Sequence, residues 1–354
     1  MIDFNNKTKI YGIRALVLSL GVLVIFTLNS CGDDGEDKGP NTDLTALTAE
    51  ISTVETLLSS SVEGNGVGEY YKNSKEPLET ALADAQTVSN NEAATQEEID
   101  AALTSLEDAR FAFAAREIED AALQFSANGS ENAIAVEQSS NSASIFNRGE
   151  FTFETWVYYT DKPGFFGQMA STEFYADGVW GWNVRVGDGD ALDFAIGDAD
   201  GESRLQPDVT AVPGAIVPRN EWVHIACTFD GTTMKSYING NEIGSLDASD
   251  RDRMGEVAAQ EGAQPLTLGN SAGFKQPERR LVGKMFDVRY WGVARSAAEI
   301  KEDMDFIIDG DETGLIGYWP FAKPATTDLI TDWASDTEGE NNLSLVDGAI
   351  VSTR

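Results

Sequence analysis

Histidine and cysteine are nearly absent from this chain, which holds one histidine and two cysteines in 354 residues. The single histidine, His224, lies three positions before Cys227 in a strand-like segment, 222–229. Positions an odd number apart in a strand point to opposite faces, so these two side chains do not meet. A Cys-His or Ser-His-Asp catalytic site is therefore disfavoured, and Cys227 is expected to be a small buried side chain.

Positive charge is also scarce. The chain carries 25 Lys and Arg against 59 Asp and Glu, for a formal net charge of −34. Such a charge disfavours nucleic acid and bare anionic lipid as partners. It is compatible with a soluble surface, with cations, or with uncharged ligands such as neutral glycans.

One long apolar run stands near the N-terminus, at residues 15–26, after Lys7, Lys9 and Arg14. It is too short for a durable membrane span. With the following Leu28-Asn29-Ser30-Cys31, it resembles a bacterial lipoprotein signal peptide, residues 1–30, with its lipobox. The resemblance implies cleavage before Cys31 and lipidation of its thiol, with acyl chains such as palmitate, which would leave Cys227 without a disulfide partner. The alternative is an ordinary secretory signal that ends near a cysteine.

Residues 31–43 then read as an acidic tether, because Gly, Asp, Glu, Pro and Asn dominate and nothing in them could pack. An acidic run directly after the cysteine resembles the surface-export signal of Bacteroidota lipoproteins, although a solvated linker explains the composition equally well. The expected location is the outer membrane, with the body of the protein on the cell surface or on the periplasmic face.

Residues 44–118 predict three amphipathic helices in a small bundle, because apolar residues recur at helical spacing in three stretches. Thr95 and Glu98 have the spacing of a capping box at the start of the third stretch. The segments Ser74-Lys75-Glu76-Pro77-Leu78 and Ala94-Thr95-Gln96-Glu97-Glu98-Ile99 resemble the FIVAR module of bacterial surface proteins. That family implies a spacer, or alternatively a binding unit.

The rest of the chain predicts a two-sheet β-sandwich or jelly roll, because short runs of β-branched and aromatic residues alternate with turn signals such as Asn239-Gly240 and Asp347-Gly348. A single helix is expected near 296–300, capped by Ser296 with Glu299 three residues on. The expected strands are 151–159, 182–186, 192–196, 222–229, 234–238, 282–291, 315–319 and 343–346.

Five ordered motifs in residues 121–354 resemble the LamG-like, concanavalin A-like lectin/glucanase jelly rolls. They are Phe151-Thr152-Phe153-Glu154-Thr155-Trp156-Val157, Trp222-Val223-His224-Ile225-Ala226, Ser236-Tyr237-Ile238-Asn239-Gly240, the run 283–291 and the run 315–321. The expected fold is therefore mainly β, a jelly-roll sandwich preceded by a three-helix bundle. On this pattern Trp156, Trp291 and Trp319 are expected in the core.

Glucanases of this fold carry a Glu-x-Asp-x-x-Glu strand that places carboxylates on one concave face. The β region has no such strand, so an enzyme, a glycoside hydrolase in particular, is not expected. The resemblance leaves two other functions open, namely carbohydrate binding and protein binding in adhesion.

The resemblance also raises calcium as a cofactor. Family sites often combine an acid in the first strand with one in the "IDEV" strand, and Asp287 matches the second. The first acid is missing, so Asn128 or Glu131 would have to supply an oxygen ligand.

A carbohydrate site needs an exposed aromatic platform beside hydrogen-bonding side chains. Aromatic residues are dense in 165–183, and Trp180 is expected at the exposed end of a strand whose Trp182 faces the core. The predicted ligand-binding residues are Tyr175, Asp177, Trp180, Asn183 and Arg185. The sequence thus predicts a lipid-anchored, non-catalytic binding protein, with a glycan or a cell-surface protein as ligand.

Overall fold

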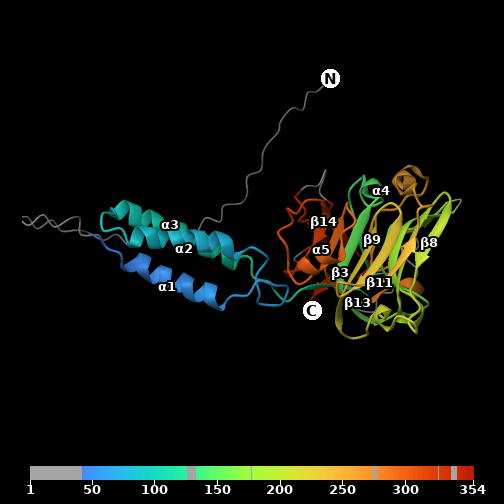
Figure 1. Ribbon diagram of the computed structural model, residues 1–354, viewed down its shortest axis with the longest axis horizontal. Helices are drawn as coiled ribbons and strands as arrows, with labels where there is room; N and C mark the ends of the chain where they lie inside the picture. The colour runs from blue at the N-terminus through green and yellow to red at the C-terminus, as the bar shows by residue number, and fades with distance from the viewer. Residues whose placement is uncertain (1–41, 126–132, 177, 274–276, 326, 336–340) are drawn as a thin grey trace, which may run out of the picture. The chain divides into compact units, whose positions relative to one another are not determined.

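The computed structural model describes residues 42–354 except 126–132, 177, 274–276, 326 and 336–340 (Figure 1). The proposed signal peptide, Cys31 and nearly all of the acidic tether lie outside the described residues, as do Asp177, Asn128 and Glu131. No helix in the described part is both long and apolar enough to cross a membrane.

Three helices form the N-terminal part of the described chain: α1 (Thr45–Ser60), α2 (Lys75–Ser89) and α3 (Gln96–Ala114). Each helix packs against the other two. Their shared core consists of one apolar stripe from each helix, because apolar residues three and four apart share a helix face. Its helical members are Leu47, Ile51, Val54, Leu78, Ala85, Ile99, Leu106 and Phe113.

Two capping boxes that the sequence predicts are present. Thr95 accepts a hydrogen bond from the backbone of Glu98, whose carboxylate accepts one from the backbone of Thr95. Ser296 and Glu299 do the same at the start of α5 (Ala297–Asp303). Each box satisfies backbone donors that a helix start otherwise leaves unpaired, so these two starts are defined locally.

The remaining chain forms two antiparallel sheets, as the sequence predicts (Figure 1). Within the described residues the first sheet has eight strands, with β14 paired to β13 beside the main path. In spatial order the path is β11 (Asn241–Asp247), β10 (Thr233–Ile238), β9 (Trp222–Phe229), β3 (Phe151–Asp161), β13 (Val282–Trp291), β1 (Ala122–Phe125) and β17 (Ile350–Ser352), and β14 covers Leu315–Trp319.

The second sheet has nine strands in the described residues, with β5 (Phe174–Tyr175) paired to β6 beside the path. The path is β15 (Leu329–Ile330), β16 (Leu343–Val346), β2 (Ile134–Glu137), β12 (Thr267–Leu268), β4 (Gly167–Ser171), β6 (Val179–Val186), β7 (Leu192–Asp198) and β8 (Gly201–Leu205). The short helices are α4 (Ser142–Ile145), η2 (Asp188–Asp190), η3 (Pro213–Ala215), η4 (Met254–Ala259) and η5 (Pro277–Arg279).

Aromatic side chains join the two sheets. Trp182 from the nine-stranded sheet lies 5.3 Å from the ring of Phe151 and 5.9 Å from that of Tyr290, both of the eight-stranded sheet. Such close ring pairs add to the burial of large apolar surfaces. Trp291 and Trp319 are buried as predicted, whereas Trp156 is only half-buried and packs against the core without belonging to it.

Two turns adopt the left-handed backbone that their sequence predicts. Asn239 and Gly240 have φ values of 48° and 67°, and Asp347 and Gly348 have 54° and 89°. Left-handed backbone at both central residues matches the twist of the flanking strands, and Asn-Gly and Asp-Gly tolerate it best. The Asn239-Gly240 turn joins the paired strands β10 and β11, whereas the Asp347-Gly348 turn joins β16 of the nine-stranded sheet to β17 of the eight-stranded sheet.

The outer face of the eight-stranded sheet holds a buried cluster of charged side chains beneath α5. Glu154 accepts hydrogen bonds from Trp291 (2.7 Å) and Arg295 (3.0 Å). Arg295 also pairs with Asp303 at the end of α5. Buried charges persist only when they are paired, so this network anchors α5 to the sheet.

Asp287, the residue predicted as a calcium ligand, belongs to this cluster. Arg289 donates to both of its carboxylate oxygens, at 3.0 and 2.7 Å, and both residues are fully buried. Burial raises the pKa of Asp287 to about 6, although Arg289 opposes the shift. The expectation that Asp287 presents free oxygens to a cation is therefore wrong, because the guanidinium of Arg289 already occupies them.

His224 is buried in the same cluster, and its Nε2 lies 3.7 Å from Oε2 of Glu154. Burial, only partly opposed by Glu154, lowers the pKa of His224 to about 4. This pKa is below the ordinary value of about 6.5. The neutral imidazole of His224 therefore contributes fully to the stability of the fold above pH 6.5. That contribution is lost as the pH falls from about 6.5 through about 4.

We predict that the imidazole signals of untagged, folded protein titrate with a midpoint near pH 4. The measurement is proton NMR, which needs no assignment because His224 is the one histidine of the chain. A midpoint near pH 6.5, in protein that circular dichroism shows to be folded, would mean that the side chain is solvated and the cluster is open.

Candidate ligand pocket on the nine-stranded sheet

The side chains of β6 alternate between the core and the outer face of the nine-stranded sheet. Trp182, Val184 and Val186 belong to the hydrophobic core. Asn183 and Arg185, at the intervening positions, therefore point to the outer face. Both are buried in spite of this, with exposed fractions of 1% and 4%. Burial of charged side chains on this outer face is stabilised where they pair with one another.

Arg185 and Asp193 form the central pair of this face. They are direct partners in the register of β6 with β7, and Nε of Arg185 lies 3.0 Å from Oδ2 of Asp193. Arg204 of β8 places Nη1 3.0 Å from the other oxygen. Asp193 is fully buried, and burial raises its pKa while Arg185 lowers it. The two guanidinium groups therefore hold a carboxylate that solvent does not reach.

A second acid, Glu173, lies beside this pair. Asn183 donates from Nδ2 to its Oε2, and Arg279 donates from Nη1 to its Oε1 at 3.4 Å. Glu173 is buried, while the side chain of Arg279 keeps about a quarter of its surface exposed. Arg279 therefore reaches over the edge of the pocket from η5.

Aromatic rings form the rim. The guanidinium carbon of Arg185 stacks 3.6 Å from the centre of the Phe166 ring, a cation–π contact. Tyr175 is paired with Val179 in the β5–β6 hairpin and leaves 52% of its surface exposed. The ring of Phe166 is thus held against Arg185, and the ring of Tyr175 is exposed to solvent.

Together these residues enclose a pocket of about 250 Å³. Its floor is polar and paired, and its rim is aromatic and polar. It is lined by Phe166, Glu173, Tyr175, Arg185, Asp188, Asp193, Arg204, Gln206 and Arg279.

The structure brings together three of the five predicted ligand-binding residues. Tyr175 and Arg185 line the pocket, and Asn183 lies just behind it against Glu173. Asp177 lies outside the described residues. The expectation for Trp180 is wrong, because only 2% of its surface is exposed and its ring belongs to the hydrophobic core. Gly181, with φ at +84°, separates it from Trp182 and breaks the simple alternation.

Phe166 and Glu173 lie in the stretch 165–183 that the sequence singles out, but neither is among the predicted ligand-binding residues. Asp188, Asp193, Arg204, Gln206 and Arg279 lie outside that stretch and were not predicted. Arg185 and Asp193 stand at matching positions on either side of a turn, which is the signal of a cross-strand pair. The other residues come from separate segments, and only the folded sheet brings them together.

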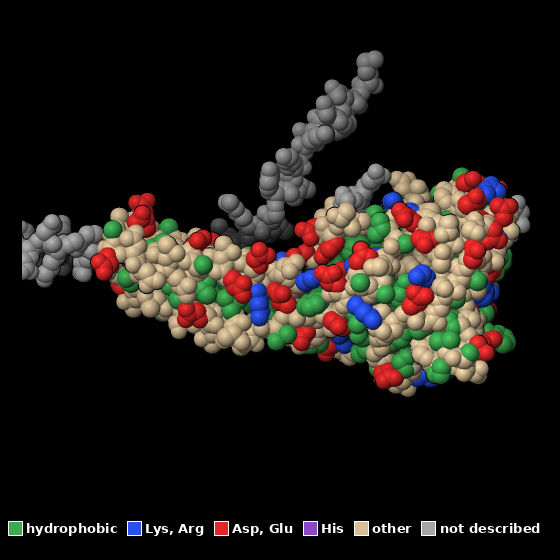
Figure 2. Space-filling model, in the orientation of Figure 1, with side chains coloured by type: hydrophobic (Ala, Val, Ile, Leu, Met, Phe, Trp, Pro, Cys, Tyr) green, Lys and Arg blue, Asp and Glu red, His purple; other side chains and the backbone are tan. Residues whose placement is uncertain are grey.

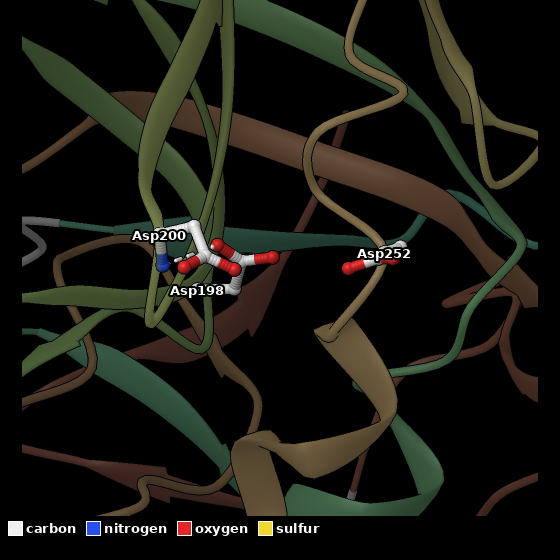
Figure 3. Close-up of side chains that lie close together, drawn as sticks. All are labelled: Asp198, Asp200 and Asp252. Carbon is white, nitrogen blue, oxygen red and sulfur yellow. Dashed lines mark hydrogen bonds between the residues drawn. The ribbon is translucent and has the colours of Figure 1, made fainter.

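A cluster of three aspartates lies near the turn between β7 and β8, and an arginine pairs with one of them. Asp198, Asp200 and Asp252 lie close together (Figure 3), and in the described part they alone have the spacing of a metal site built from three acidic, histidine or cysteine side chains. Asp198 is buried, and its Oδ1 accepts from Arg251 (2.8 Å) and from the backbone of Asp200 (2.9 Å). The charge of Asp198 is thus already balanced by Arg251.

Two family models match the chain. The FIVAR domain matches residues 43–114, and the model for the concanavalin A-like lectin/glucanases superfamily matches residues 121–301. A search of curated protein sequences found no significant match.

Several solved structures resemble the fold. A proposed carbohydrate binding protein from Bacteroides ovatus is 23% identical with a TM-score of 0.48, over 66% of this chain and 60% of that one. A heptameric SAP-like pentraxin from Limulus polyphemus is 12% identical with a TM-score of 0.41, over 66% and 95%. The CBM40 of a Ruminococcus gnavus IT-sialidase, bound to α2,3-sialyllactose, is 12% identical with a TM-score of 0.38, over 51% and 90%.

The chain thus spans about 60% of the length of the Bacteroides ovatus protein. The order of the elements, two antiparallel sheets after a helical module, agrees with both family matches. With a match that covers residues 121–301 of 354, the chain belongs to the concanavalin A-like lectin/glucanases superfamily, and a FIVAR domain precedes that fold.

Proposed function

We propose that this protein is a lipid-anchored binding protein that holds carbohydrate, without catalysis, in the pocket on the outer face of its nine-stranded sheet. The observation that carries the proposal is the pocket itself, in which buried, paired polar side chains form the floor and Phe166 and Tyr175 form the rim. Carbohydrate sites combine these two features, because sugar rings have an apolar face and a polar edge.

Exposure of Tyr175 supports the proposal. A tyrosine with 52% of its surface exposed, paired with Val179 in the β5–β6 sheet, offers a ring against which a sugar could stack. Arg204, Gln206 and Arg279, all half-buried, stand around it with hydrogen-bonding groups. Planar guanidinium and amide groups are suited to the paired hydroxyls of a sugar.

The engagement of the pocket's two buried carboxylates supports a non-catalytic role. Glycoside hydrolysis needs one carboxylic acid and one free carboxylate on either side of the bond. In this pocket Asp193 is held by Arg185 and Arg204, and Glu173 is held by Asn183 and Arg279. Release of reducing sugar from a bound glycan would contradict this part of the proposal.

The anchor belongs to the same proposal. Cys31, lipidated after removal of residues 1–30, would attach the chain to the outer membrane, with the acidic tether and the helical module as spacers before the binding domain. The strongly acidic surface, visible as the scattered red side chains of Figure 2, agrees with exposure to solvent on the cell surface.

We predict that Tyr175→Ala weakens glycan binding about tenfold, because loss of one aromatic stacking surface costs about 1–1.5 kcal/mol. The measurement is a glycan-array screen followed by titration calorimetry on the best glycan. Phe111→Ala is the matched control, since Phe111 on α3 is 61% exposed and lies outside the pocket. That control is expected to bind like the unaltered protein.

Two results would contradict the proposal that this pocket binds carbohydrate. One is the absence of any bound glycan together with saturable binding to a cell-surface protein, which would favour the adhesion function. The other is equal loss of affinity in Tyr175→Ala and Phe111→Ala, which would place the site elsewhere.

For the anchor, we predict that Cys31→Ser abolishes incorporation of radiolabelled palmitate and moves the protein from the membrane fraction to the soluble fraction. Cys227→Ala is the control and should keep the label, because Cys227 is fully buried and burial raises the pKa of its thiol. Undiminished labelling of Cys31→Ser would refute lipidation at this residue. Digestion of the protein by protease in intact cells would place it on the cell surface.

A further inference from the structure

The charges that line the pocket cancel. Glu173, Asp188 and Asp193 carry three negative charges, and Arg185, Arg204 and Arg279 carry three positive ones, so the lining is neutral overall. Each arginine is already paired with an acid of the floor, at 3.0 to 3.4 Å. An acidic sugar would therefore meet guanidinium groups whose charge Asp193 and Glu173 already balance. It would also approach a chain whose net charge is −34.

Two buried amide groups next to this floor carry atoms without a hydrogen-bond partner in the described residues. Gln168 of β4 is the register partner of Arg185, and it is fully buried. Among the described residues, neither its Oε1 nor its Nε2 has a hydrogen-bond partner. Oδ1 of Asn183 also lacks a hydrogen-bond partner among the described residues, although Nδ2 of this residue donates to Glu173.

These atoms are a mixed set, with at least one donor and two acceptors in the amide groups of Gln168 and Asn183. A carboxylate only accepts hydrogen bonds, and an ammonium group only donates them. A hydroxyl group does both, so a hydroxyl is the ligand group that matches the set.

A buried amide without partners also destabilises the protein that carries it. An apolar side chain of the same length would fill the position of Gln168 without that cost. Polar groups of this kind are characteristic of functional sites, where local stability is sacrificed for binding.

We propose that the pocket selects an uncharged sugar over an acidic one, and that Gln168 and Asn183 reach its hydroxyl groups through bridging water. This inference rests on the proposed carbohydrate binding, and it adds the class of ligand and two residues that define it. Gln168 is the register partner of Arg185 and is not part of the pocket lining itself, so its role is that of a specificity-determining residue next to the floor.

The test uses the full chain in detergent and an array of neutral oligosaccharides, each beside a counterpart in which one hydroxymethyl group is oxidised to a carboxylate. The unaltered protein should bind the neutral member of a pair at least tenfold more tightly. Tighter binding of the carboxylated members would overturn this inference and leave carbohydrate binding intact. Absence of binding to any glycan would overturn both.

Gln168→Met tests the role of the buried amide, since methionine has nearly the same length and no polar group. We expect about tenfold weaker binding of the neutral glycan and an unchanged or higher melting temperature. Gln124→Met, the same change in β1 of the other sheet, is the control and should leave binding unchanged. A lower melting temperature with unchanged affinity would show that Gln168 is structural only.

A second variant tests the balance of charge independently of Gln168. Glu173→Gln keeps the shape of the floor but removes the negative charge that pairs with Arg279, so the preference for neutral over carboxylated glycans should fall several-fold. Glu242→Gln changes the net charge equally at an exposed ion pair with Lys235 on β10 and β11, and it should leave the preference unaltered. Equal changes in the two variants would overturn the inference.

Discussion

The buried ion pair between Arg185 and Asp193 is the interaction on which the proposed site depends. Asp193 is fully buried on the outer face of a sheet, where an unpaired carboxylate would be strongly destabilising. Arg185 lies opposite it in the strand register and Arg204 completes the contact. Because this pairing requires one register of β6 on β7, the same strands that place Trp182 in the core also place the guanidinium groups at the floor of the pocket.

The charged outer faces of the two sheets are covered to different extents. On the eight-stranded sheet, α5 covers the charged cluster around Glu154 and Arg289, and His224 and Asp287 are sealed beneath it. On the nine-stranded sheet, a pocket between Phe166, Tyr175 and Arg279 leaves part of the charged face accessible. Burial of paired charges thus serves stability on one face, and on the other we infer that it prepares a surface for a ligand.

Much of the fold follows from local sequence signals. The capping boxes at Thr95 and Ser296, the Asn239-Gly240 turn and the long strands rich in aromatic residues are all visible in the chain, and the structure confirms them. Short strands such as β5 and β12 are not visible, because two residues carry no periodic pattern. The site was predicted only in part, since Glu173, Asp193 and Arg279 meet through tertiary packing, and the buried position of Trp180 depends on the backbone at Gly181.

The most direct test of carbohydrate binding in this pocket is to map a bound glycan by NMR, through the Nε–Hε signals of the arginine side chains. We predict that a neutral oligosaccharide shifts the signals of Arg185, Arg204 and Arg279, which line the pocket, and leaves those of Arg289 and Arg295 beneath α5 unchanged. Binding that shifts none of the three pocket arginines would contradict the account and would place the ligand on another surface of the protein.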